Sequence, residues 1–201
     1  MTPVELVVFD IGNVLIEWQP EAYYDRVFGQ DFRRSLFEAV DLHAMNDRID
    51  RGADFATVVA ETAAAHPKFS QAISHWHDQW HLIAAPVIKD SAQSLSALKA
   101  RKVRTAILSN IGEVPFEIAQ AAYPFLSDVD FPFLSGPLKM AKPDPSIYAY
   151  VERATGVAPE AMLFVDDRGE NIAAARERGW QVHHFHGTAG WLEALATHGL
   201  R

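Results

Sequence analysis

The chain has 201 residues, of which 49% are hydrophobic and 22% charged, and its formal net charge is −8. This length and composition predict one globular domain, or a domain with a modest insertion, and no apolar stretch approaches the roughly 20 residues of a membrane span. The acidic charge disfavours a nucleic-acid or anionic membrane surface, and the absence of cysteine excludes disulfides and thiolate chemistry. Without a signal-peptide pattern at its start, the chain is expected to be cytoplasmic, and the sequence predicts no oligomeric state.

Short apolar runs that stop at polar residues predict the strands. The first covers residues 5–9 and ends at Asp10, and the same design recurs at 104–108, 131–134, 161–165 and 181–185. Helical patterns lie between these runs, at 91–101, 113–122, 145–155 and 170–178. The alternation predicts an α/β fold with a doubly wound parallel sheet, similar to a Rossmann fold, and a ligand site at the carboxyl ends of the strands.

One long segment breaks this alternation. It contains no convincing strand but has helical patterns at 21–28, 32–40, 55–65 and 70–82. Because the segment leaves directly after the first strand, we expect an inserted all-helical cap over the carboxyl end of the sheet. The predicted division is a core of residues 1–16 and 86–201 and a cap of residues 17–85.

Polar residues follow the predicted strands or the loops after them. They are Asp10, Ser109, Asn110, Lys142, Asp166 and Asp167. Each alone has an ordinary interpretation as a turn or helix-capping residue. A parallel sheet, however, brings its strand ends together, so these side chains are expected to converge on one cleft.

Carboxylates, a hydroxyl and one ammonium group in such a cleft suit phosphoryl transfer. Asp10 and Asp166 are the expected ligands of Mg²⁺, which takes oxygen donors and keeps several waters. The cation and Lys142 would offset charge on the transferring phosphoryl group, while Ser109 and backbone amides would hold its oxygens. A carboxylate such as Asp10 can also attack phosphorus and form an aspartyl phosphate that water then cleaves.

Four segments carry a family resemblance. They are Val8 to Leu15, Leu108-Ser109-Asn110, Lys142 to Tyr148 and Phe164 to Ile172. In order they resemble the four motifs of the haloacid dehalogenase superfamily, and the helical insertion between the first two resembles the cap of its helical-capped subfamily. The Asp-x-Gly-Asn-Val sequence of the first motif resembles a branch that includes sugar-phosphate phosphatases, one of which acts on glucose 1-phosphate.

The resemblance implies a role for each matched residue. Asp10 would be the nucleophile and a metal ligand, with the Gly12 carbonyl and Asp166 as further ligands. Asp167 would support the metal through water or hydrogen bonds, and Lys142 would stabilise charge. Ser109 and Asn110 would contact phosphate. Asn13 opens the linker to the cap, where specificity residues often lie, and is expected to bind substrate.

One position departs from the family pattern. Phosphatases of this family usually place a second Asp, the general acid and base, two residues after the nucleophile, where this chain has Gly12. General acid-base assistance contributes about 10²- to 10⁴-fold, so its loss lowers the rate without abolishing the mechanism. The proton could come from water, from the substrate itself, or from a cap residue such as His43, Asp47 or Asp50.

The sequence therefore predicts a magnesium-dependent phosphatase that acts on a small phosphorylated metabolite, with a sugar phosphate favoured. One alternative is a 2-haloacid dehalogenase, which also lacks the second Asp and needs no metal, although Gly12-Asn13-Val14 does not match the Tyr-Gly-Thr sequence typical of that branch. Another is a catalytically weak homologue that binds a phosphate ligand or a partner. Trp76 and Trp80 are expected to pack the cap or its seam with the core, with a sugar-binding cavity as the alternative.

Overall fold

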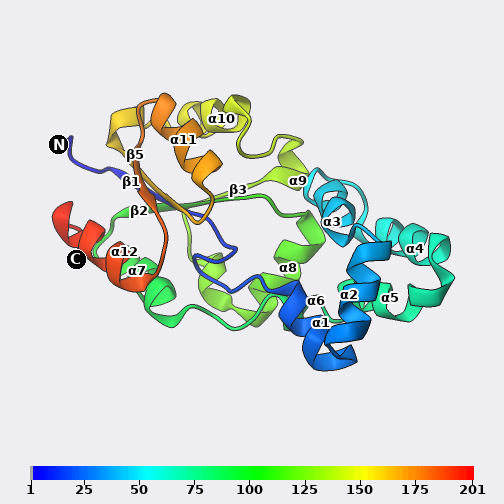
Figure 1. Ribbon diagram of the computed structural model, residues 1–201. Helices are drawn as coiled ribbons and strands as arrows, with labels where there is room; N and C mark the ends of the chain where they lie inside the picture. Colours follow the sequence, from blue (N-terminus) through cyan, green and yellow to red (C-terminus); the bar gives the residue numbers. More distant parts are fainter. Residues whose placement is uncertain (1) are drawn as a thin grey trace.

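The computed structural model describes residues 2–201 and contains a five-stranded, wholly parallel sheet with strand order β3-β2-β1-β4-β5 (Figure 1). The strands are β1 (Leu6–Phe9), β2 (Arg104–Ser109), β3 (Phe131–Leu134), β4 (Met162–Asp166) and β5 (Gln181–His184). The chain begins in the middle of the sheet and reverses direction beside β1. This arrangement confirms the predicted doubly wound sheet, and the reversal point is where such folds bind ligands.

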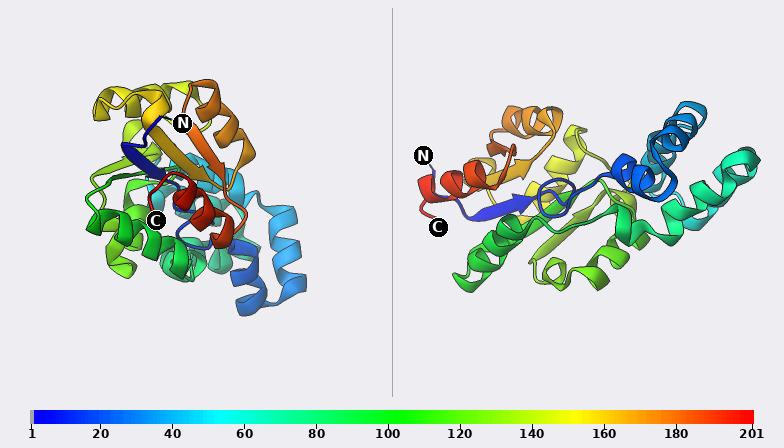
Figure 2. Two further views of the ribbon diagram at one scale, coloured as in Figure 1. Left: turned by 90° about the vertical axis from the view of Figure 1, so that its left-hand side faces the viewer. Right: turned by 60° about the horizontal axis from the view of Figure 1, so that its bottom comes forward.

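Helices cover both faces of the sheet (Figures 1 and 2). The helices of the sheet domain are α7 (Lys89–Ala100), α8 (Glu113–Ala122), α9 (Ser135–Leu138), α10 (Pro145–Thr155), α11 (Gly169–Glu177) and α12 (Thr188–Thr197), with 3-10 turns η2 (Pro124–Ser127) and η3 (Pro159–Ala161). Alternation along β1 directs Leu6 and Val8 into an apolar cluster with α10 and α11. Val7 and Phe9 point the other way, and the Phe9 ring meets Trp191 of α12 edge-on with 5.4 Å between centroids.

The helical part extends beyond the carboxyl end of the sheet (Figure 1). It consists of α1 (Pro20–Phe28), α2 (Gln30–Ala39), α3 (Leu42–Asp50), α4 (Phe55–Ala65), η1 (Pro67–Phe69), α5 (Ser70–Asp78) and α6 (Trp80–Ile83). Tyr24 and Trp76 are fully buried between these helices. This part matches the predicted all-helical cap, and we refer to it as the cap.

The structure adds three helices that the sequence analysis did not predict, namely α3, α9 and α12. The signals for α3 were present but short: the Asp41 carboxylate accepts a hydrogen bond from the Ala44 amide, and Leu42, Met45 and Ile49 form one buried face. The predicted helix at 70–82 is divided into α5 and α6, because the main chain leaves helical geometry at Gln79.

Two connections join the cap to the core, and they are hydrogen-bonded to each other. The Glu17 amide donates to the Pro86 carbonyl at 2.9 Å, and the Ile88 amide donates to the Leu15 carbonyl at 2.8 Å. This pairing lies next to the predicted boundaries at 16/17 and 85/86, which we retain as a proposal. Among residues 2–201, no helix has the length and apolarity that crossing a membrane requires.

Candidate active site

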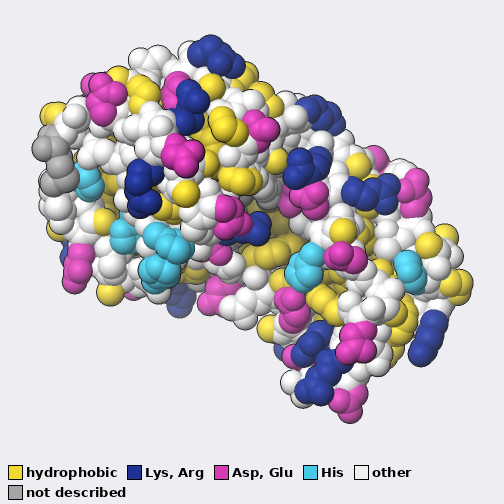
Figure 3. Space-filling model, turned by 45° about the horizontal axis from the view of Figure 1, so that its top comes forward, with side chains coloured by type: hydrophobic (Ala, Val, Ile, Leu, Met, Phe, Trp, Pro, Cys, Tyr) yellow, Lys and Arg dark blue, Asp and Glu magenta, His cyan; other side chains and the backbone are white. Residues whose placement is uncertain are grey.

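The polar strand ends meet at one edge of the sheet. Asp10 follows β1, while Ser109 and Asp166 are the last residues of β2 and β4. Asp10 and Ser109 line a cavity of about 610 Å³ between the sheet edge and the cap, where Figure 3 shows the molecule hollowed, and Asp166 is buried beneath them. The cavity is lined from the sheet domain by Asp10, Gly12, Asn13, Ser109, Asn110, Lys142, Asp167 and Arg168, and from the cap and its linker by Trp18, His43, Asn46, Asp47, Asp50 and Trp80. The predicted convergence of the strand-end residues is therefore present.

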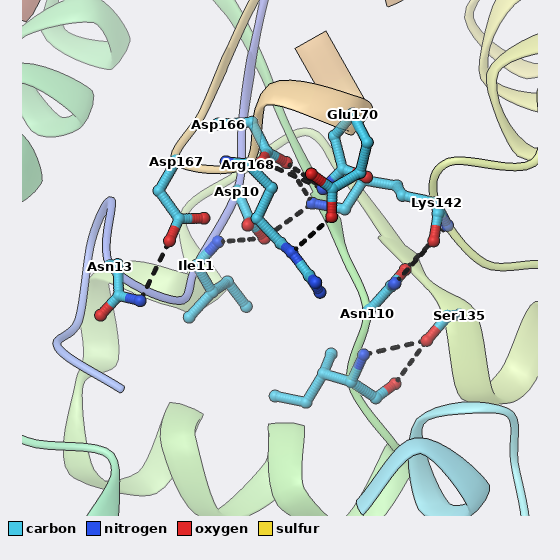
Figure 4. Close-up of polar contacts among 12 residues, drawn as sticks. Asp10, Ile11, Asn13, Asn110, Ser135, Lys142, Asp166, Asp167, Arg168 and Glu170 are labelled. Carbon is cyan, nitrogen blue, oxygen red and sulfur yellow. Dashed lines mark hydrogen bonds and ion pairs between the residues drawn. The ribbon is translucent and has the colours of Figure 1, made fainter. Parts of the chain in front are cut away.

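The buried ammonium group of Lys142 lies between two carboxylates (Figure 4). Its Nζ is 2.9 Å from Asp10 Oδ1 and 2.6 Å from Asp166 Oδ2, and all three side chains are at most 9% exposed. The Ile11 amide also donates to Asp10 Oδ1, at 2.7 Å, and the Ser109 hydroxyl lies beside the same carboxylate. The Asp10 carboxylate is thus held in a fixed orientation at the floor of the cavity.

Asp166 is held from below by the first turn of α11. Asn171 Nδ2 lies 3.0 Å from both carboxylate oxygens of Asp166, and the Arg168 amide donates to Oδ1 at 2.8 Å. Asn171 lies within the fourth motif, and no role was predicted for it. Its position five residues after Asp166, in the helix that begins there, was the available signal.

Charge at the site is unbalanced. Burial raises the pKa of Asp10 to about 7, with Lys142 opposing this shift and the negative charge of Asp166 adding to it. Burial alone would lower the pKa of Lys142, but the carboxylates of Asp10 and Asp166 outweigh it and raise that pKa. Burial also raises the pKa of Asp167. Three carboxylates facing one ammonium group favour a further cation.

The donor set fits such a cation. Asp10, Asp166 and Asp167 each offer a carboxylate oxygen, and these three oxygens lie within 4.8 Å of one another. Mg²⁺ binds oxygens at about 2.0–2.1 Å in octahedral geometry, so two of its ligands stand roughly 3–4 Å apart. Gly12 lines the same cavity, and its carbonyl stays a predicted ligand.

The side chains of Asn110 and Asn13 both form hydrogen bonds within the protein. Asn110 exchanges hydrogen bonds with the main chain of Lys142, donating to its carbonyl at 2.9 Å and accepting from its amide at 2.8 Å. Asn13, in left-handed backbone geometry with φ of 55°, donates to Asp167 Oδ2 at 3.0 Å and accepts from the Trp18 amide at 2.9 Å. Both residues line the cavity. Their contacts with substrate remain a prediction.

Two tryptophans form an aromatic wall on the cap side. Trp18 and Trp80 line the cavity with ring centroids 5.9 Å apart. Trp76 is fully buried behind them and donates from Nε1 to Asn46 Oδ1 at 3.0 Å. Trp76 therefore packs the cap, as expected. Trp80 is also buried in the core cluster, as expected, and it lines the cavity as well.

Comparison with protein families gives one match over most of the chain. Residues 4–179 match the family model described as haloacid dehalogenase-like hydrolase. Among curated proteins, the phosphorylated carbohydrates phosphatase of Thermotoga maritima is 21% identical over 204 residues, covering 96% of this chain and 92% of that protein. Bifunctional epoxide hydrolase 2 of Mus musculus is 29% identical over 118 residues, and the match spans 57% of this chain but only 21% of that relative's length.

Solved structures show the same fold. A HAD family enzyme of Bacteroides thetaiotaomicron, in its magnesium complex, has a TM-score of 0.73 at 19% identity, with 96% of this chain and 99% of that chain covered. The L-2-haloacid dehalogenase of Xanthobacter autotrophicus, with chloropropionic acid covalently bound, has a TM-score of 0.65 at 22% identity, with 98% and 84% covered. A shared fold does not determine the reaction, so the residues of the site have to decide it.

Proposed function

The chain belongs to the haloacid dehalogenase-like hydrolases, and from that premise we propose that it is a magnesium-dependent phosphatase of small phosphorylated metabolites. The observation that carries the proposal is the arrangement of Asp10, Asp166 and Asp167 around one possible cation position, with Lys142 between the first two. Without a cation, these carboxylates would repel the phosphate dianion that the reaction requires.

Each residue of the site would have its own role in phosphoryl transfer. One oxygen of the Asp10 carboxylate attacks phosphorus, the bond to the leaving oxygen breaks, and an aspartyl phosphate forms. Lys142 and the Ser109 hydroxyl face the phosphoryl oxygens and stabilise their charge. Water then attacks the aspartyl phosphate, releasing inorganic phosphate and restoring Asp10. Mg²⁺, held by Asp10, Asp166, Asp167 and the Gly12 carbonyl, would supply charge neutralisation for both steps.

A sugar phosphate is the favoured substrate class. On the side of the cap and its linker, the cavity is lined by the rings of Trp18 and Trp80 and by the polar side chains of Asn46 and Asp47. Aromatic faces contact the apolar face of a sugar ring, while amide and carboxylate groups pair with its hydroxyls. A cavity of about 610 Å³ accommodates a monosaccharide phosphate with water to spare. The similarity to a phosphorylated carbohydrates phosphatase over 96% of the chain supports the same class.

Haloacid dehalogenation is the second candidate, because the fold matches a dehalogenase and Gly12 does not exclude that reaction. In that reaction the same carboxylate would displace halide from carbon without a metal. The cluster of three carboxylates argues against it, since a metal-free site would leave their repulsion uncompensated.

The decisive experiment measures phosphate release from a panel of phosphorylated metabolites, with and without Mg²⁺, for the wild type and for Asp10→Asn. We expect metal-dependent release that Asp10→Asn abolishes. The matched control is Glu61→Gln, an exposed carboxylate-to-amide change on α4, away from the cavity. Metal-independent halide release from 2-chloropropionate would replace the proposal by dehalogenation. If none of the substrates is turned over, a ligand-binding role would replace the proposal of a phosphatase.

A further inference from the structure

The cavity lacks an acid at the position where related phosphatases carry one. Gly12 has no side chain, so the proton that the leaving oxygen needs must come from elsewhere. Four titratable cap residues line the cavity, namely Asp41, His43, Asp47 and Asp50. The Asp41 carboxylate caps α3 by accepting a hydrogen bond from the Ala44 amide at 2.8 Å. The other three could supply the proton.

Two of these three residues are exposed and already paired. The His43 side chain is 57% exposed and lies 2.9 Å from Glu21, and the Asp47 side chain is 56% exposed and lies 2.7 Å from Arg51. Among the described residues, neither side chain has a hydrogen bond to the loop that follows β2. A proton donor must be held within hydrogen-bond reach of the reacting oxygen, which these exposed side chains are not arranged to do.

A hydrogen bond to the main-chain carbonyl of Asp50 holds the end of α3 beside the loop that follows β2. The buried Ser135 hydroxyl donates to the Asp50 carbonyl and accepts from the Ile111 amide at 2.9 Å, so it joins the end of α3 to the residue after Asn110. Figure 4 labels Ser135, and Figure 1 shows that α9, the helix that begins at Ser135, lies next to α3. A Cβ at Gly112 would come within 2.9 Å of Ile49 Cγ2, so the approach of α3 to this loop needs glycine there.

The Asp50 carboxyl group is also oriented by its neighbours. Asn46 Nδ2 donates to Asp50 Oδ2 at 2.8 Å, and the two residues share a face of α3 because they are four apart. Trp76 Nε1, which can only donate, occupies Asn46 Oδ1 and so fixes which end of the amide faces Asp50. Burial raises the pKa of Asp50 well above its ordinary value, and the charges of Asp47 and Asp10 add to the shift, while the Gly112 amide and Arg51 oppose it.

We infer that Asp50 is the catalytic residue that protonates the leaving oxygen, an inference that rests on the proposed phosphatase function. The attacking and leaving oxygens lie roughly in line across phosphorus. A phosphate held by Asp10 and Ser109 at the sheet edge would therefore point its leaving oxygen toward the cap, whose lining of the cavity includes Asp50.

With Asp50 as proton donor and acceptor, the protons balance in the formation and in the hydrolysis of the aspartyl phosphate. When the phosphorus–oxygen bond of the substrate breaks, the Asp50 carboxyl gives its proton to the departing oxygen and becomes a carboxylate. In the second step that carboxylate accepts a proton from the water that attacks the aspartyl phosphate. Phosphate leaves, and the Asp10 carboxylate and the Asp50 carboxyl are both restored.

The test compares substrates that differ in their need for a proton. The kcat/KM of the wild type, Asp50→Asn and the matched control Glu61→Gln is measured with Mg²⁺ on p-nitrophenyl, phenyl and benzyl phosphate. We expect Asp50→Asn to lose about 10²- to 10⁴-fold on benzyl phosphate, whose alkoxide must be protonated. On p-nitrophenyl phosphate, whose phenolate leaves without a proton, the loss should stay under about tenfold. Glu61→Gln should resemble the wild type on all three.

The ratio between substrates is internal to one protein sample, so partial unfolding of a variant does not alter it. Equal losses on the three substrates would overturn the inference and leave Asp50 as a residue that only docks the cap. A steeper leaving-group dependence for Asp47→Asn or His43→Gln than for Asp50→Asn would assign the proton to that residue instead. Absence of Mg²⁺-dependent turnover in the wild type would overturn the proposed function itself.

Discussion

The side chain of Asn110 and the main chain of Lys142 form a reciprocal pair of hydrogen bonds, at 2.9 and 2.8 Å. Lys142 sits on a loop after the short helix α9, where no regular element fixes it, and the preceding loop after β2 supplies the anchor. The Lys142 ammonium group contacts both Asp10 and Asp166. The Asn110 side chain therefore fixes the position of the cation that lies between these two carboxylates.

Asn110→Ala should therefore lower kcat more than it changes KM. Removal of the anchor lets the Lys142 main chain shift, and misplacement of a catalytic group by about 1 Å costs on the order of 10²-fold. Steady-state kinetics on p-nitrophenyl phosphate measure both constants, with Gln120→Ala, which removes a half-buried amide on α8 that donates to Ser127, as the control. A raised KM with unchanged kcat would instead assign Asn110 to direct phosphate binding, as the family resemblance implies.

Magnesium should stabilise the folded protein in the absence of substrate. A cation among Asp10, Asp166 and Asp167 relieves repulsion that only the folded state contains. At about 100 times Kd, ligand binding contributes about 2.7 kcal/mol, which corresponds to a rise in Tm of roughly 5–10 °C for a chain of this size. Thermal unfolding monitored against MgCl₂ concentration measures it.

Asp167→Asn should reduce this rise by at least half, because the amide removes one charged ligand while it can still accept the hydrogen bond from Asn13. Glu61→Gln should keep the full rise. An equal rise in both variants would mean that Mg²⁺ binds elsewhere.

A peripheral ion pair should make stability depend on pH. Glu152 of α10 accepts two hydrogen bonds from Arg178, at 2.8 and 2.6 Å, and one from Trp180, at 2.9 Å. The Arg178 guanidinium holds the pKa of Glu152 below its ordinary value. The stabilisation is therefore fully present above the ordinary pKa of about 4.3 and is lost as the pH falls through the lower pKa of the folded state.

Glu152→Gln should lower the free energy of unfolding by about 1.5–3 kcal/mol at pH 7, the range typical of hydrogen bonds to a charged group. The difference from the wild type should shrink below about pH 4, as Glu152 becomes protonated. Urea unfolding at a series of pH values from 7 to 3 measures it, with the exposed Glu177→Gln as the control. A difference that stays constant over this range would mean that packing, and not charge, is responsible.

The sequence was sufficient for the sheet and for the residues at its strand ends, because both follow from local signals. A run such as Leu6–Phe9 is buried on both faces and ends at an acid, and parallel pairing then places Asp10 beside Ser109 and Asp166. Neither step needs information about distant contacts.

The contacts that orient those residues could not be predicted in the same way. Ser135 meets the main chain of Asp50 across 85 positions of sequence, and Asn46 meets Trp76 across 30. Nothing local marks either pair, and the helix that carries Asp50 was itself missed, although its Asp41 cap and its apolar face were present in the sequence. The choice among His43, Asp47 and Asp50 depends on these contacts and therefore required the structure.

The last prediction concerns an acid placed at position 12, where phosphatases of this family usually have Asp. Gly12 lies outside the left-handed region, and a Cβ there would meet only Trp18 Cβ, at an ordinary 3.7 Å, so the backbone admits a side chain. In an Asp50→Asn background, Gly12→Asp should raise kcat/KM on benzyl phosphate by at least about tenfold, since general acid assistance contributes about 10²- to 10⁴-fold. On p-nitrophenyl phosphate the change should be under about threefold, because that leaving group needs no proton. Gly12→Ala in the same background adds the Cβ without the acid and should give no recovery. Equal recovery by both substitutions would trace the gain to backbone restriction and would remove the support for a missing proton donor.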